Sequence, residues 1–121
     1  MNVLVTGSNG LIGRTLISKL GDRYLFTGLD VTRAEADGAP TTVADASQLE
    51  AILPAFEGIE AVVHLAANAP VETPWPDVLQ NNITATHNVF EACRRAGIRR
   101  IVFASSNHAV GLFEQIGRAH V

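Results

Sequence analysis

The fold is decided near the N-terminus, by the stretch Asn2-Val3-Leu4-Val5-Thr6-Gly7-Ser8-Asn9-Gly10-Leu11-Ile12-Gly13. A short β-rich run leads into three glycines, and apolar residues at helical spacing continue to Leu20. This pattern predicts a strand, a tight turn and a helix. Gly7 permits the turn, Gly10 lets the backbone approach a phosphate closely, and Gly13 lets the helix pack on the strand. The first turn of the helix offers free N–H groups to an anion.

The rest of the chain alternates between the same two kinds of segment. We expect further strands at 24–30, 41–44, 61–66 and 100–104, helices at 46–56 and 73–97, and a loop at 31–40. Alternating strands and helices indicate parallel strands joined by right-handed crossovers. The predicted fold is therefore α/β, a Rossmann-type doubly wound parallel sheet that is incomplete, with about five strands in the order 3-2-1-4-5. In the long helix, the stripe expected to face the core is Leu79, Ile83, Thr86, Phe90 and Cys93.

Composition narrows the class of protein. The chain has 121 residues, 47% of them hydrophobic, and a net charge of −3, which disfavours a nucleic-acid surface. No stretch approaches the apolar length of a membrane span. One cysteine excludes an internal disulfide, and the chain runs from Met1 straight into a strand, so we expect a cytoplasmic protein without a signal peptide. No metal ligands are predicted.

A carboxylate stands at the end of the second predicted strand. Asp30 follows the glycine stretch at the distance where such an acid accepts hydrogen bonds from an adenosine ribose. It would repel a 2′-phosphate, which favours NAD over NADP. Arg33 lies three residues further on and softens that preference. The alternative is a solvated loop acid.

Together these residues resemble a known family. Thr-Gly-x-x-Gly-x-x-Gly with a strand-end Asp is similar to the extended short-chain dehydrogenase/reductases, the NAD-dependent epimerase/dehydratase family. The similarity runs from Val3 to about Phe113. Within it four further landmarks match in order: Asp45-Ala46, His64-Leu65-Ala66-Ala67, Asn82 and Ser105-Ser106. Ala46 is a mild departure, because the family often has a larger residue there. The resemblance implies NAD as cofactor, bound by Gly7, Asn9, Gly10, Leu11, Ile12, Gly13, Asp30, Asp45, Ala46, Leu65, Ala66, Ala67 and Asn82.

Several landmarks also have a purely structural interpretation. We expect His64 to be a satisfied, partly buried histidine rather than a catalytic base. Asn82 could hydrogen-bond neighbouring backbone, and Asp45 could be the N-cap of the helix that follows it. Cys93 is expected in the core.

The resemblance implies Ser106 as the catalytic serine, because the family places it five residues before a glycine, here Gly111. The family completes its site with a Tyr-x-x-x-Lys pair, whose tyrosine exchanges the proton while hydride moves. This sequence has no such pair, since Tyr24 is its single tyrosine and Lys19 its single lysine.

The residues after the serine point to a subfamily. Ser106-Asn107-His108 resembles uronate dehydrogenases, which implies that Asn107 and His108 bind substrate. Ala69-Pro70 is a departure, because that subfamily carries a substrate-binding serine there.

The function implied is the N-terminal NAD-binding part of a sugar-active oxidoreductase, which transfers hydride between NAD and a sugar or sugar-acid hydroxyl. A homo-oligomer is implied for the full-length protein. The alternatives are a nucleotide-sugar epimerase or dehydratase, and a non-catalytic NAD-binding module. Residues 116–121 match one reading frame of a common sequencing adapter. We therefore expect residues 1–115 to be a partial NAD-binding Rossmann domain, residues 116–121 a non-native tail, and the fragment itself inactive.

Overall fold

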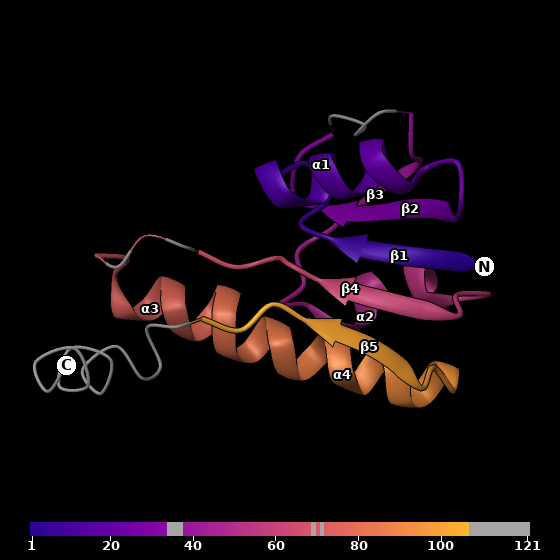
Figure 1. Ribbon diagram of the computed structural model, residues 1–121. Helices are drawn as coiled ribbons and strands as arrows, with labels where there is room; N and C mark the ends of the chain where they lie inside the picture. The colour runs from indigo at the N-terminus through magenta and orange to yellow at the C-terminus, as the bar shows by residue number, and fades with distance from the viewer. Residues whose placement is uncertain (34–37, 69, 71, 107–121) are drawn as a thin grey trace, which may run out of the picture.

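Five parallel strands form one sheet in the computed structural model, which describes residues 1–33, 38–68, 70 and 72–106 (Figure 1). The strands are β1 (Asn2–Thr6), β2 (Leu25–Asp30), β3 (Thr41–Val43), β4 (Ala61–His64) and β5 (Arg100–Phe103). Their order is β3-β2-β1-β4-β5, as predicted, and every neighbouring pair is parallel. The predicted strands begin and end within two residues of the observed ones.

Both faces of the central strand are buried. Val3 and Val5 of β1 pack in one apolar cluster with Ile17 of α1 (Leu11–Leu20), whereas Leu4 packs in a second cluster. Successive residues of a strand point to opposite faces, so a continuous apolar run is what a doubly covered strand requires. In Figure 1, α1 lies on one side of the sheet and α4 on the other.

The second cluster takes residues from three helical segments on the other face of the sheet. It contains residues of α2 (Leu49–Ile52), of the 3₁₀ turn η1 (Leu53–Phe56) and of α4 (Ala85–Ala96). The sequence predicted one helix over 46–56, and the observed segment is a single α-turn that tightens into a 3₁₀ turn at Pro54. Proline has no N–H to continue an α-helical bond pattern.

The long predicted helix is three segments: α3 (Trp75–Val78), the π-helix η2 (Leu79–Thr84) and α4. The predicted core stripe is wrong for Leu79, Ile83 and Phe90, which are 43%, 51% and 41% exposed. A π-turn holds an extra residue, so a count at 3.6 residues per turn loses phase across it. Phe90 lies at the margin of the buried face, against Phe103.

The prediction that Cys93 belongs to the core is confirmed, since it is 1% exposed. The buried face of α4 comprises Ala85, Asn88, Val89, Ala92 and Cys93. The helix ends as predicted at Gly97, whose φ of 73° lies in the left-handed region that glycine adopts without strain. Among the described residues, no helix has both the length and the apolar character needed to cross a membrane.

Candidate functional site

The glycine loop between β1 and α1 leaves no space for a side chain at Gly7 or Gly13. Gly7 has a φ of 71°, and a Cβ on it would lie 2.9 Å from the backbone N of Ala66. A Cβ on Gly13 would lie 2.6 Å from the carbonyl oxygen of Gly7. Both contacts are with backbone, so a larger residue at either position would displace the loop. A Cβ on Gly10 would lie 3.3 Å from the same oxygen, a tight contact.

The first turn of α1 is open to an anion. Gly10 is its N-cap, and within the described residues no side chain caps the turn and no acidic residue lies in it. Leu11 and Ile12 at this end are 84% and 65% exposed. The first N–H groups of a helix need acceptors from outside the helix, and its dipole favours a negative charge there. The arrangement therefore suits a phosphate.

A cavity of about 400 Å³ opens at the carboxyl ends of β1, β2 and β4, where a doubly wound sheet binds its ligands. Nine of the thirteen residues predicted to bind cofactor line it: Gly7, Asn9, Gly10, Asp30, Asp45, Ala46, Leu65, Ala66 and Ala67. The other four, Leu11, Ile12, Gly13 and Asn82, do not line it. The wall also contains residues that were not predicted, namely Leu29, Val31, Thr32, Ala44, Asn68, Asn81 and Ala85. Most of them directly follow or precede a predicted one, which is the signal that could have found them.

Asp30 is held at the edge of this cavity by hydrogen bonds. The backbone N–H of Asn9 donates to its Oδ2 at 3.0 Å, and the backbone N–H of Thr32 donates to its Oδ1 at 3.2 Å. The side-chain amide of Asn9 donates to the Oγ1 and the carbonyl oxygen of Thr32, at 2.7 and 3.1 Å. Each oxygen of a carboxylate can accept two hydrogen bonds. Among the described residues Oδ2 accepts one, so it can still accept from a ligand hydroxyl.

Asp45 occupies the cavity wall after β3. Its Oδ1 accepts from the backbone N–H of Ser47 at 2.9 Å, and its Oδ2 accepts from the side chain of Gln80 at 3.2 Å. The pKa of the Asp45 carboxyl is lowered, chiefly by the backbone hydrogen bond from Ser47. The predicted alternative of an N-cap is wrong, because α2 begins only at Leu49 and Gln48 is its N-cap. Asp45 instead closes a local turn.

The π-helix η2 places one polar residue in the cavity wall and bonds two others to residues that line it. Gln80 bonds Asp45, Asn81 lines the wall, and Asn82 pairs with the backbone of Asn68. The Asn82 side chain accepts from the Asn68 N–H at 2.7 Å and donates to the Asn68 carbonyl oxygen at 3.1 Å. The structural interpretation of Asn82 is therefore confirmed: it holds the loop after β4.

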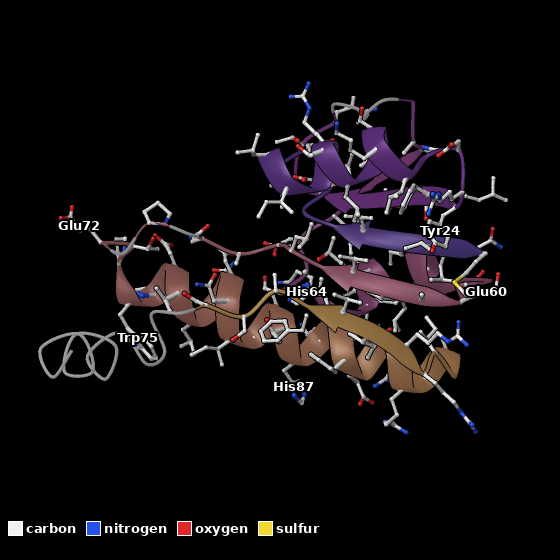
Figure 2. All side chains as sticks on the ribbon, viewed as in Figure 1. Tyr24, Glu60, His64, Glu72, Trp75 and His87 are labelled. Atoms are coloured by element: carbon white, nitrogen blue, oxygen red, sulfur yellow. The ribbon has the colours of Figure 1, made fainter. Side chains whose placement is uncertain are left out.

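His64 ends β4 and is 1% exposed. Its Nδ1 lies 2.6 Å from Thr6 Oγ1 and its Nε2 lies 2.9 Å from Thr86 Oγ1. Burial lowers the pKa of the imidazole below its ordinary value of 6.5. The prediction of a satisfied histidine is confirmed, and the ring is fully buried where partial burial was expected. Figure 2 shows His64 inside the fold and Tyr24 at the other end of the sheet, and Tyr24 does not line the cavity.

Ser106 lies three residues after the end of β5, is exposed, and does not line the cavity. The predicted substrate residues Asn107 and His108 lie outside the described residues. Within the described ranges, no three His, Cys, Asp or Glu side chains are grouped so that they could hold a metal ion.

Comparison with known proteins places this geometry in context. The sequence model described as "NAD dependent epimerase/dehydratase family" matches residues 3–120. The chain is 37% identical to the NAD-dependent glucose-6-phosphate dehydrogenase of Haloferax volcanii, over 96% of this chain and 47% of that protein. It is 40% identical to the L-arabinose 1-dehydrogenase (NAD(P)(+)) of the same organism, over 88% of this chain and 41% of that protein.

A solved structure of a related enzyme has the same fold as this chain. A mutant uronate dehydrogenase from Agrobacterium tumefaciens, complexed with NAD, superposes with a TM-score of 0.81 at 34% identity, over 88% of this chain and 41% of that chain. The chain therefore spans less than half of the length of each of these proteins.

Proposed function

The chain belongs to the NAD dependent epimerase/dehydratase family, and from this we propose that it forms the NAD-binding part of a sugar-active oxidoreductase. The reaction is hydride transfer between NAD and a hydroxyl-bearing carbon of a sugar or sugar acid. The similarity to a glucose-6-phosphate dehydrogenase, an L-arabinose 1-dehydrogenase and a uronate dehydrogenase supports this class of substrate.

The observation that carries the proposal is the cavity between the glycine loop and Asp30. The glycine contacts and the open first turn of α1 fit a pyrophosphate, which needs close backbone approach and unpaired N–H donors. Gly7, Gly10 and Gly13, with the turn at Leu11 and Ile12, hold it in this assignment.

The two ends of the cavity are assigned to the two halves of the dinucleotide. Asp30, positioned by Asn9, accepts hydrogen bonds from the adenosine ribose, and its charge disfavours a 2′-phosphate. Asp45 and Ala46 line the adenine side. On the nicotinamide side the wall consists of Leu65, Ala66 and Ala67, and Asn82 supports the loop that follows them.

Bound NAD supplies the hydride acceptor, and the protein must hold the substrate and move a proton. We assign Ser106 to orient the substrate oxygen, and Asn107 and His108 to bind the sugar. Ser106 cannot serve alone, because oxidation of a hydroxyl needs a proton acceptor. The 121 residues contain no Tyr-x-x-x-Lys pair to provide one. We therefore expect these residues to bind NAD without turnover.

Calorimetric titration tests the proposal. NAD should bind the 121-residue chain, and NADP should bind more weakly. Asp30→Asn should lower the affinity for NAD by about tenfold, because a charge-assisted hydrogen bond is lost. Asp22→Asn is the matched control, since Asp22 is an exposed acid beyond the far end of α1. Failure of NAD to bind, or equal loss in both variants, would contradict the proposal.

A further inference from the structure

Three side chains form a hydrogen-bonded chain across the interior beneath the cavity. Thr6 at the end of β1 lies 2.6 Å from His64 Nδ1, and Thr86 in α4 lies 2.9 Å from His64 Nε2. Thr6 is 0% and His64 1% exposed, and Thr86 is half-buried. This series of hydrogen bonds therefore joins three elements that are far apart in sequence.

Each of these three residues adjoins the cavity wall. Gly7 follows Thr6, Leu65 follows His64, and Ala85 precedes Thr86, and all three neighbours line the cavity. A shift of the hydrogen-bonded chain would move backbone on three sides of the cavity at once. None of the three hydrogen-bonded side chains lines the cavity itself.

The hydrogen bonds of Thr6 determine which atoms donate and which accept between Thr6, His64 and Thr86. Its Oγ1 accepts from the backbone N–H groups of Leu65 and Ala66, at 3.1 and 3.2 Å. A hydroxyl has two acceptor positions and one hydrogen. Both acceptor positions are used, so the hydrogen is donated to His64 Nδ1. The neutral ring must then carry its own hydrogen on Nε2, which donates to Thr86.

We propose that His64 is a positioning residue of the cofactor cavity, locked as the neutral Nε2–H tautomer, and that its protonation weakens the binding of NAD. The inference rests on the proposed function, because it takes NAD as the occupant of the cavity. A protonated imidazole has donors at both nitrogens. Thr6 Oγ1 could accept from Nδ1 only by giving up one of its two backbone donors. The N–H of Leu65 also donates to the carbonyl oxygen of Thr6, at 3.1 Å, so the loss of the Ala66 bond is the change that would loosen the segment lining the cavity.

The surroundings of His64 favour a single proton step. β1, α4 and β5 bring Thr6, Thr86 and Phe103 against the ring, with Phe103 stacked at 5.8 Å between centroids. None of these side chains titrates, and desolvation alone lowers the pKa of His64. Free carboxylates ordinarily titrate near pH 4 and free imidazoles near pH 6.5, so the range from about pH 5 to about pH 8 reports mainly on histidines. The sequence has four histidines, and a His64→Asn variant separates His64 from the other three.

Two measurements on the 121-residue chain test the inference. Long-range proton–nitrogen NMR spectra without cofactor should show His64 with a bare Nδ1 and a protonated Nε2 at about pH 7.5. Calorimetric titration with NAD should show an affinity that falls about tenfold as pH drops from about 7.5 to about 5. His64→Asn should remove this pH dependence, and His87→Asn, which changes an exposed histidine, should retain it.

A second pair of variants guards against a His64→Asn protein that fails to fold. Thr86→Ser keeps the hydroxyl that accepts from Nε2, and Thr86→Val replaces it with a methyl of similar size. We expect Thr86→Ser to bind NAD like the parent and Thr86→Val to bind severalfold more weakly.

The outcomes separate this inference from the proposed function. Protonation at Nδ1, a pH profile unchanged by His64→Asn, or equal affinities of the two Thr86 variants would overturn the role of His64, even in a chain that binds NAD. A correct tautomer in a chain that binds no NAD at any pH would overturn the cavity assignment, and with it the positioning role for that cofactor.

Discussion

The backbone N–H of Asn9 donates a 3.0 Å hydrogen bond to Oδ2 of Asp30, so the glycine loop and the carboxylate at the end of β2 hold each other in place. The side chain of Asn9 extends this link by donating twice to Thr32. The loop that would hold a pyrophosphate and the carboxylate that would bind a ribose are thus joined by direct hydrogen bonds. This link can be tested without altering the carboxylate.

Asn9→Ala removes only the two hydrogen bonds to Thr32 and leaves the Asp30 side chain unchanged. We expect it to lower the affinity for NAD about fivefold. The free energy of unfolding should fall by about 1 kcal/mol. Asn2→Ala is the control: it removes one side-chain hydrogen bond, to Gly58, at the opposite end of the sheet. Equal NAD affinity in the two variants would show that the side chain of Asn9 does not support the cavity.

Ser8→Ala should raise the stability of the protein. Ser8 is 0% exposed, and its Oγ has no hydrogen-bond partner among the described residues. Its side chain packs on Gly28, where an added Cβ would lie 2.8 Å from the Cβ of Ser8. Removing an unsatisfied buried hydroxyl should increase the free energy of unfolding by about 1 kcal/mol, measured by urea denaturation. A decrease would mean that this hydroxyl is satisfied in solution.

The buried His64 makes stability depend on pH. Its pKa in the folded protein is lowered by burial, so the unfolded chain binds the proton more readily. Stability is therefore highest above the unfolded pKa of about 6.5 and falls as pH drops from there toward the folded pKa. The difference in unfolding free energy between the parent and His64→Asn should shrink across this range. A constant difference between about pH 8 and about pH 5 would contradict a neutral buried ring.

Cys93 provides an independent probe of the core. It is the single cysteine of the sequence, and burial raises its pKa to about 11. A thiol reagent at about pH 8 should therefore label the folded protein far more slowly than the protein in urea, because the thiolate is the reactive form. Rapid labelling of the folded chain would show that α4 does not stay packed on the sheet.

Much of the fold follows from local patterns. The order of the strands was predictable, because a buried apolar run, a glycine turn and alternating helices permit few topologies. The carboxyl-end position of the cavity follows from that topology. Asp30 and the residues after β4 were predictable from their places at strand ends and from the family resemblance.

Other features depend on contacts between distant segments. The π-turn at Leu79–Thr84 is accompanied by bonds from Gln80 to Asp45 and from Asn82 to Asn68, which no local periodicity encodes. The predicted core stripe therefore lost phase there. The link from Asn9 to Thr32 was missed for the same reason, since it joins two loops that meet only in the folded sheet.

The most direct test of the cavity assignment is a backbone amide NMR titration of the 121-residue chain with NAD. We expect the largest shifts at the N–H groups of Gly10 through Gly13, at Asp30 and at Ala66, and little change around Tyr24 at the other end of the sheet. Two results would contradict the assignment of this cavity to the dinucleotide. One is glycine-loop amides whose chemical shifts do not change at saturating NAD, and the other is chemical-shift changes confined to the Tyr24 end of the sheet.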